Sequence, residues 1–280
     1  MTYTSIMVGL DLGAGSRERT RLAAQLAERF QARLIGVASR QPDYPRGHGA
    51  DNPRGYGQIS VLGGSAMEEI RKAALADVAE TEKAFRAAAG MARRIEWRCG
   101  LEDPEVFLEE QSRAADLVVI GRLGGEDLSD PRMSVNAGVA LMALGRPVLV
   151  VPPGVDHLSL KRIVVAWKNT LQTRRAISDA MPLLKLAEQV QVVRIAVPED
   201  HEDVEDVVKF LGLHGVNAIP FRQSPDGASV AVSLQEAAKA VGAGLIVSGA
   251  YGHNRVREWF FGGVTRALLD HCPICCLMSH

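Results

Sequence analysis

Short apolar runs rich in β-branched residues alternate with longer amphipathic stretches along the whole chain. The runs have the length of β-strands, and the stretches between them repeat apolar residues every three or four positions, as helices do. In residues 17–30, for example, Leu22, Leu26 and Phe30 follow one another at four-residue steps. Regular alternation of strand and helix is typical of βαβ units around a parallel sheet.

The pattern predicts five strands in each half of the chain. In the first half they are expected at Ile6–Leu10, Leu34–Ala38, Ile95–Cys99, Leu117–Ile120 and Val148–Val151. In the second half they are expected at Ile163–Trp167, Val190–Ala196, Asn217–Phe221, Leu245–Ser248 and Ile274–Met278. Each half should have about four helices, the clearest of them over residues 17–30, 65–89, 104–115, 173–187, 201–214, 228–241 and 264–271.

The two halves also repeat each other in sequence. ADLVVIGRLGG at 115–125 matches AGLIVSGAYGH at 243–253, and SIMVGLDLG at 5–13 matches RIVVAWKNT at 162–170. An internal repeat of this length indicates tandem units of one architecture. We therefore predict an α/β protein of two Rossmann-like domains, 1–152 and 161–280, each with a five-stranded parallel sheet, joined by a linker at 153–160.

Charge and hydropathy exclude several classes of function. The chain has 280 residues, with 32 Lys and Arg against 33 Asp and Glu, and both halves are close to neutral. A balanced charge argues against a nucleic-acid partner. No apolar run is long enough for a membrane span, and the first residues lack the features of a secretory signal. These observations predict a cytoplasmic protein that is not bound to a membrane.

Four cysteines are present, and three of them lie close together near the C-terminus. Cys272 and Cys275 have the spacing of a metal or redox pair. However, the run PICCLM at 273–278 reads as a buried strand, and residues three apart on a strand point to opposite faces. Reduced cysteines packed as apolar side chains are therefore favoured over a metal site.

The segment GAYGHNRVREWFFGGVT at 249–265 contains four glycines in a defined spacing. Gly249 and Gly252 follow a predicted strand, and Gly262 and Gly263 precede a predicted helix nine residues further on. Glycines after a strand let the backbone approach a flat ligand closely. The free N–H groups at the start of the helix suit an anion such as phosphate, and Thr265 can add a hydroxyl donor.

This glycine spacing, together with the doubled α/β pattern, resembles the universal stress protein family in its tandem two-domain form, whose domains have the adenine nucleotide alpha hydrolase-like fold. The resemblance implies a non-catalytic, ATP-binding stress-response protein, with Mg²⁺ accompanying the nucleotide. By that resemblance the adenine would contact Ala166, Trp167 and Ala196, and the ribose would lie near Gly249 and Gly252. The phosphates would meet Gly262, Gly263, Val264 and Thr265, with Lys168 as a charge partner.

Neither half keeps the complete family motif. In the second half, Gly263 replaces a hydroxyl residue, and Lys168 stands where the family has an aspartate. In the first half Asp11 matches that aspartate, but only Gly121 and Gly124 of the glycine set remain. Asp127 and Asp130 also bring negative charge to the region where phosphates would lie. We therefore expect the first half to be unable to hold a triphosphate.

Other functions remain open on the sequence alone. The pockets could be vestigial and the protein a structural or interaction module, or the second half could hold another small anion or a lipid-like ligand. The Gly- and Pro-rich stretch 40–58 reads as a tolerated insertion or as a lid, and His253 as a surface residue or a general base.

The family pairs its domains through their fifth strands, so Val148–Val151 and Ile274–Met278 should pair within one chain as a pseudo-dimer. Pairing of whole chains into a homodimer is compatible with this arrangement.

Overall fold

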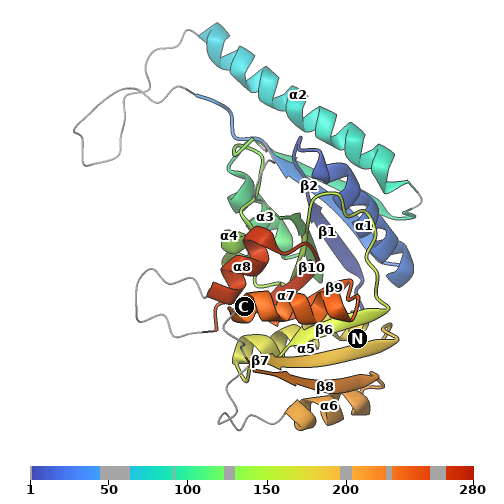
Figure 1. Ribbon diagram of the computed structural model, residues 1–280. Coiled ribbons are helices and arrows are strands. Elements are labelled where there is room, and N and C mark those ends of the chain that lie inside the picture. The colour runs from blue at the N-terminus through green and yellow to red at the C-terminus, as the bar shows by residue number, and fades with distance from the viewer. Residues whose placement is uncertain are drawn as a thin grey trace, which may run out of the picture.

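The computed structural model contains one ten-stranded sheet with helices on both faces (Figure 1). It describes residues 2–44, 64–90, 92–122, 130–195, 204–224, 229–252 and 263–280. The strands are β1 (Ser5–Gly9), β2 (Arg33–Ser39), β3 (Ile95–Gly100), β4 (Leu117–Gly121), β5 (Val148–Val151), β6 (Arg162–Ala166), β7 (Gln189–Ile195), β8 (Ala218–Gln223), β9 (Leu245–Gly249) and β10 (Cys275–Ser279). The helices are α1 (Gly15–Phe30), α2 (Gly64–Ala89), α3 (Pro104–Ser112), α4 (Ala137–Ala143), α5 (Leu171–Leu184), α6 (Val204–Leu213), α7 (Val230–Ala240) and α8 (Gly263–His271).

The strand order shows two copies of one parallel unit joined at a central seam. The order is β3-β2-β1-β4-β5-β10-β9-β6-β7-β8, so β3 and β8 are the two outer strands. Every neighbouring pair is parallel except β5 and β10, which are antiparallel, with Leu149 opposite Leu277. The predicted pairing of the fifth strands within one chain is therefore confirmed. The boundaries proposed for the two domains stay a prediction.

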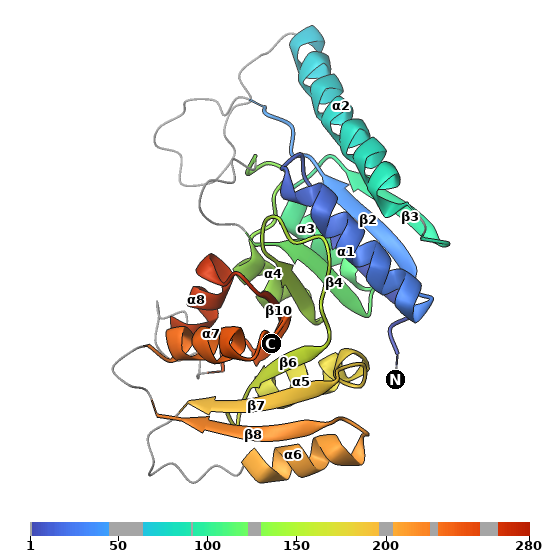
Figure 2. The same cartoon turned by 45° about the vertical axis from the view of Figure 1, so that its right-hand side comes forward.

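Two apolar cores lie on the two faces of the sheet, each between the sheet and one layer of helices. Alternate residues of each strand point to opposite faces of the sheet. In β1, Ile6 and Val8 join the core beneath α1, α2, α5 and α6, whereas Met7 joins the core beneath α3, α4, α7 and α8. Figures 1 and 2 show α2 and β3 at one end of the molecule and α6 and β8 at the other.

The strands agree with the sequence pattern to within two residues at their ends, with one informative difference. The last strand begins at Cys275, so Cys272 lies before it, in the turn that follows α8. The argument from opposite faces of one strand therefore does not apply to Cys272 and Cys275, because Cys272 lies in the turn between α8 and β10. The short α4 was not assigned a range from the sequence. The N-cap of α4 stabilises its start, because Asn136 Oδ1 accepts the N–H groups of Gly138 and Val139.

None of the helices in the described ranges has the length and apolar character that crossing a membrane requires.

Candidate functional site

The loops at the carboxyl ends of the first and fourth strands of each half contain the residues singled out by the sequence. Open parallel sheets bind ligands at this edge. The relevant strands are neighbours in both halves, because β1 pairs with β4 and β6 pairs with β9. Each half therefore has one candidate site of the same construction.

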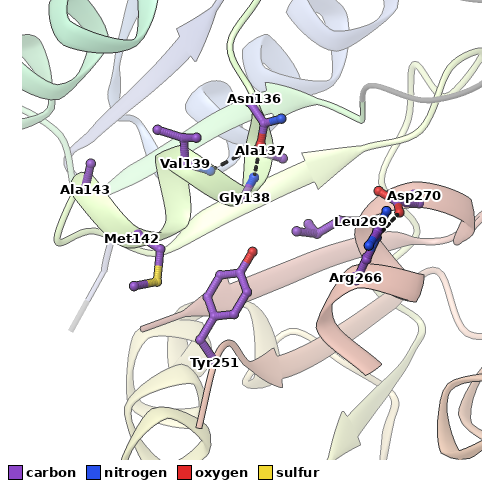
Figure 3. Close-up of a pocket in the computed structure, with 10 residues that line it drawn as sticks. All are labelled: Asn136, Ala137, Gly138, Val139, Met142, Ala143, Tyr251, Arg266, Leu269 and Asp270. Atoms are coloured by element: carbon purple, nitrogen blue, oxygen red, sulfur yellow. Dashed lines mark hydrogen bonds and ion pairs between the residues drawn. The ribbon is translucent and has the colours of Figure 1, made fainter. Parts of the chain in front are cut away.

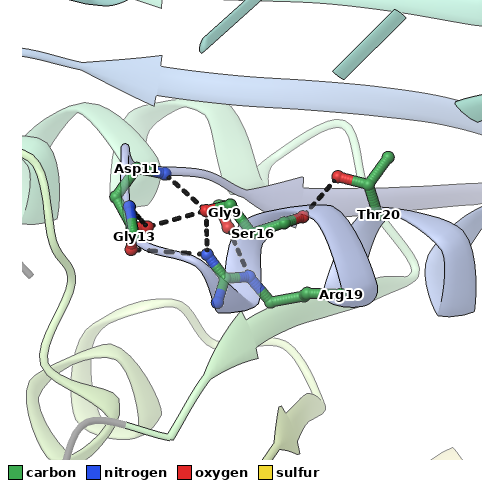
Figure 4. A network of polar contacts seen from close by, with 6 residues as sticks. All are labelled: Gly9, Asp11, Gly13, Ser16, Arg19 and Thr20. Carbon is green, nitrogen blue, oxygen red and sulfur yellow. Dashed lines mark hydrogen bonds and ion pairs between the residues drawn. The ribbon is translucent and has the colours of Figure 1, made fainter. Parts of the chain in front are cut away.

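In the first half, Asp11 follows β1 and closes a turn onto the start of α1 (Figure 4). Its Oδ1 accepts hydrogen bonds from the Gly13 N–H at 2.8 Å and from the Ser16 hydroxyl at 2.7 Å. The Ser16 oxygen accepts the Asp11 N–H at 3.1 Å. One carboxylate oxygen of Asp11 is thus engaged by hydrogen bonds within its own loop.

The second Asp11 oxygen faces Arg19, a buried residue of α1. Arg19 Nη2 lies 3.3 Å from Asp11 Oδ2 and donates to Ser16 Oγ at 2.9 Å, while Nε donates to the Gly9 carbonyl oxygen at 2.9 Å. The arginine side chain is only 7% exposed. A Cβ added to Gly121, at the end of β4, would lie 2.2 Å from Arg19 Nη1. The guanidinium group therefore fills the space between the ends of β1 and β4.

Asp130, a second acidic residue of the first half that the sequence analysis singled out, is also paired. Asp130 Oδ2 lies 3.0 Å from Arg40 Nη2, and Arg40 Nε donates to Asp77 of α2 at 2.8 Å. The two aspartates outnumber the single arginine that they share. Asp127 lies outside the described ranges, so the expectation that the first half cannot hold a triphosphate stays a prediction.

In the second half, Ala166, Trp167 and Lys168 are consecutive at the end of β6. The Trp167 N–H donates to the Val193 carbonyl oxygen at 2.8 Å, which extends the pairing of β6 with β7. The Trp167 ring packs against the core on the α5 side, and its Nε1 is buried without a hydrogen-bond partner in the described ranges. Lys168 is exposed at the surface.

Gly249, at the end of β9, lies directly against the first turn of α5. A Cβ added there would lie 2.5 Å from the Thr173 backbone nitrogen. This glycine is needed for close packing of helix on strand. In the first half the corresponding contact is made by the Arg19 side chain, because Gly121 is likewise the last residue of its strand.

Helices α1 and α5 differ at the residue that faces the carboxyl ends of the first and fourth strands of their half. Ala176 of α5 occupies the same place relative to the start of β6 that Arg19 occupies relative to the start of β1. Ala176 is fully buried. The second half therefore has a methyl group where the first half has a guanidinium, and α5 packs closer to the fourth strand of its half.

Gly252 and the start of α8 complete the described part of the second site. A Cβ on Gly252 would lie 3.2 Å from Thr170 Cγ2. Tyr251, between the glycines, has a φ of 56°, and its N–H donates to Thr265 Oγ1 at 3.4 Å. Thr265 is buried, and the hydrogen bond from Tyr251 shows that its hydroxyl faces this loop. Gly263 and Val264 begin α8, and Gly263 is exposed with open space around it.

Several residues of the predicted site lie outside the described ranges. They are Ala196, Gly262, and the stretch from His253 to Phe261 with its arginines and aromatic residues. Most of the stretch 40–58 also lies outside. The structure therefore brings Ala166, Trp167, Lys168, Gly249 and Gly252 together at one edge, and the contact of the α8 start with phosphates stays a prediction.

A groove of about 590 Å³ separates α4 from α8, close to the seam between the halves (Figure 3). Tyr251 points into it from the loop after β9, and a Cβ on Gly138 would lie 2.9 Å from the tyrosine oxygen. Burial, followed by the charge of Asp270, raises the pKa of Tyr251. The rest of the lining is mostly apolar, with an Arg266–Asp270 ion pair at 3.2 Å on α8.

The three C-terminal cysteines are buried and reduced. The adjacent Cys276 thiol lowers the pKa of Cys272 to about 7, against the effect of burial. Burial raises the pKa of Cys275 to about 12. No group of three His, Cys, Asp or Glu side chains in the described residues could hold a metal ion. Cys275 belongs to the core beneath α1, α2, α5 and α6, whereas Cys272 and Cys276 belong to the core on the opposite face of the sheet.

Arg19 and Tyr251 are the two residues of these sites that the sequence analysis did not identify. Arg19 lies among apolar positions of α1, beside Leu22 and Leu26, which is unusual for a charged residue. That placement was the available signal for a buried ion pair. Tyr251 lies between two glycines, and its positive φ could not be anticipated from a residue type that rarely adopts it.

Comparisons with solved structures identify the fold. A universal stress protein from Archaeoglobus fulgidus aligns over 98% of this chain and 95% of its own, with 14% identity and a TM-score of 0.67. A Pseudomonas aeruginosa protein of unknown function aligns over 99% and 92%, with 13% identity and a TM-score of 0.57. No protein-family model matches the sequence, and no curated protein sequence matches it. The chain has the fold of a tandem universal stress protein along nearly its whole length.

Proposed function

We propose that the protein is a universal stress protein that binds one adenine nucleotide per chain, in its second half, without catalytic turnover. The observation that carries this proposal is the difference between Arg19 and Ala176 at equivalent places. In the first half a guanidinium occupies the edge of the sheet, whereas the second half has no side chain of that size at the same position. One nucleotide site per chain follows from this difference.

The residues at the second edge suit a phosphorylated ligand. Lys168 is exposed at the end of β6 and supplies positive charge where the first half has Asp11. Gly263 opens α8 with free space around it, so an anion could approach the first N–H groups of that helix. ATP would bring Mg²⁺ with it, since the described part of the edge provides no cluster of carboxylates for a resident metal.

A second candidate function is supported by the contact at Gly249. The first turn of α5 lies so close to this glycine that part of the edge is filled by helix backbone. The Thr265 hydroxyl is also engaged by the Tyr251 N–H. If these contacts close the edge to ligands, the protein is an interaction module that keeps the fold without the nucleotide.

The test is nucleotide binding by the full chain and by one matched pair of variants. Mass spectrometry of the denatured purified protein reports any nucleotide that co-purifies, and calorimetric titration with Mg-ATP reports a weaker site. Gly263→Asp places a negative charge at the start of α8, and we expect it to weaken ATP binding about tenfold or more. Gly64→Asp is the control, because Gly64 also opens a helix, α2, with open space around it.

The outcomes separate the two functions. Binding of one ATP per chain that is lost in Gly263→Asp and kept in Gly64→Asp supports the nucleotide site. Absence of ATP binding up to millimolar concentration, with a folded protein, would overturn it and leave the interaction module. Equal weakening in both variants would also contradict the placement in the second half.

A further inference from the structure

Helix α4 is apolar on every side, although one side of it faces the surface. Its seven residues, AGVALMA, include no polar side chain. Three of them pack into the core, whereas Val139 and Met142, about one turn apart, are 44% and 40% exposed. A surface helix normally places polar residues on its outer side, and a helix that is apolar all round is normally covered on all sides. The sequence of α4 therefore fits a helix whose outer side is covered by a partner.

The corresponding helix of the second half has an ordinary polar outer side. α8 is the fourth helix of its half, as α4 is of the first. It includes Arg266 and Asp270, whose side chains are 72% and 41% exposed. The fold therefore does not require an apolar outer side at this helix, and the apolar surface of α4 is a property of the first half alone.

A groove lies on each side of α4. The groove toward α8 has a volume of about 590 Å³ and is lined by Val139 and Met142 (Figure 3). The groove toward α3 has a volume of about 210 Å³ and is lined by Val139 and by Val106 of α3, which is 49% exposed. Three large exposed apolar side chains thus lie together between and beside two grooves. A surface of this kind accepts the apolar side of a helix.

The charged residues that line the two grooves are mostly acidic. Asp103, Glu105 and Glu109 line the groove toward α3, which has no lysine or arginine among its described lining residues. In the groove toward α8, Arg266 is the one described cation, and it is paired with Asp270 at 3.2 Å. Four carboxylates against one guanidinium favour a positively charged partner and disfavour a negatively charged one.

We propose that the outer side of α4, with the grooves beside it, is the docking site for a basic amphipathic helix of a partner protein. The apolar side of that helix covers Val139, Met142 and Val106, and its lysines or arginines lie toward the carboxylates of α3. A second copy of this chain fits less well. A symmetric dimer would place the same acidic surface on both sides of the interface, and three apolar side chains are few for a stable dimer, which buries about 1,200–2,000 Å². The proposal does not depend on nucleotide binding by the second half.

The test measures binding of a synthetic helix to the full-length protein by fluorescence anisotropy. The probe is a labelled peptide of about 18 residues, or roughly five helical turns, with leucines along one side and lysines along the other. Its counterpart has glutamates in place of the lysines. We expect the lysine peptide to bind with a micromolar Kd, and the glutamate peptide to bind at least about tenfold more weakly.

Two pairs of variants locate the site. Met142→Lys should weaken binding of the lysine peptide by about tenfold or more. Leu75→Lys is its control, because Leu75 is 48% exposed on α2, over the other face of the sheet, and binding should be unchanged. Glu109→Lys should weaken binding of the lysine peptide by about threefold or more and strengthen that of the glutamate peptide. Glu110→Lys is the control for charge, because Glu110 is the next residue of α3 and lines neither groove.

Binding that is lost in Met142→Lys and Glu109→Lys and kept in the two controls supports the proposal. A folded protein that does not bind the lysine peptide up to about 100 μM overturns it. Equal binding of the two peptides, or binding that Met142→Lys leaves unchanged, also overturns it. If sedimentation shows a dimer that Met142→Lys dissociates, the surface is occupied by a second copy and the proposal is wrong. If Met142→Lys does not fold, Val139→Lys is measured in its place by the same criteria.

Discussion

The two halves of the molecule share a strand order but end differently at the edge where ligands bind in this fold. In the first half an arginine from α1 reaches across the end of β1 and pairs with Asp11. In the second half the equivalent position of α5 is Ala176, and the helix backbone itself lies against Gly249. The comparison shows that one architecture can fill the space between its first and fourth strands with a charged side chain or by closer packing of a helix.

The largest expected effect comes from breaking the buried ion pair of the first half. Arg19→Ala removes the cationic partner of the buried Asp11 carboxylate and the hydrogen bond from Arg19 to the Gly9 carbonyl oxygen, and we expect it to lower the free energy of unfolding by about 3–5 kcal/mol. Urea denaturation measures this change. Arg17→Ala should change stability by less than about 0.5 kcal/mol. A loss of similar size in both variants would show that Arg19 does not act through its buried contacts.

The second prediction concerns the close packing in the second half. Gly249→Ala places a methyl group 2.5 Å from the Thr173 nitrogen, which belongs to backbone and cannot rotate away. We expect a loss of about 1–3 kcal/mol in urea denaturation. Gly263→Ala, in open space at the start of α8, should be neutral or slightly stabilising. A neutral result for Gly249→Ala would mean that α5 lies farther from β9 than described.

A third difference lies at the opposite edge of the sheet and predicts a dependence on pH. Asp116 Oδ2 accepts the Thr4 N–H and the Thr4 hydroxyl at 2.7 Å each, and the Ser5 N–H at 3.1 Å. Burial acts to raise the pKa of Asp116, but these hydrogen bonds and Arg146 outweigh it and lower the pKa below 3.8. The second half has no carboxylate here, because Gly244 takes the equivalent position, with its N–H bonded to the Arg162 carbonyl oxygen.

We therefore expect Asp116→Asn to lose about 1 kcal/mol of stability at pH 7. A carboxyl group with a lowered pKa stabilises the folded state above its unfolded pKa, and the benefit is lost as the pH falls through the folded pKa. The difference between the two proteins should thus be constant from pH 5 upward and vanish below the folded pKa of Asp116, under 3.8. Thermal unfolding over this pH range measures it, and a gap that persists at the lowest pH would contradict the role of the charge.

The smallest effect sharpens the contrast between buried and exposed ion pairs. Arg266 and Asp270 lie one turn apart on α8, with side chains 72% and 41% exposed. Arg266→Ala should cost only about 0.3–0.5 kcal/mol, and the cost should disappear in high salt because exposed pairs are screened. The Arg19→Ala loss should be much less sensitive to salt. Urea titrations at low and high sodium chloride provide the comparison, and equal salt dependence would contradict it.

The fold could be predicted from the sequence because the pattern of apolar residues is periodic and occurs twice along the chain. The strands could be assigned from β-branched runs such as Leu117–Ile120. The tandem architecture could be assigned from the repeat of ADLVVIGRLGG, and neither step needs information about contacts between distant residues. The end of α8 at His271 agrees with the predicted helix 264–271, whereas the turn that holds Cys272 between this helix and the strand from Cys275 is visible only in the packed structure.

The site was less predictable than the fold. Asp11, Gly249 and Lys168 could be placed at the edge of the sheet, since each follows a strand closely in the sequence. Their contacts could not, because Arg19 reaches Asp11 only through the packing of α1 against β1, and Thr173 meets Gly249 only through that of α5 against β9. Spacing in the sequence predicts where a residue lies on a strand or helix. Which side chain fills the space at the strand ends depends on side-chain rotamers and on how the helices pack.

The antiparallel join between β5 and β10 determines how the molecule can meet its surroundings. Because the strand direction reverses there, the carboxyl ends of β1 and β4 point one way along the sheet and those of β6 and β9 point the other. A single partner surface docked flat against one edge would therefore contact the arginine-closed half or the lysine-bearing half, and not both. The two candidate sites thus lie on opposite sides of the molecule, one beside the buried Arg19 and the other beside the exposed Lys168.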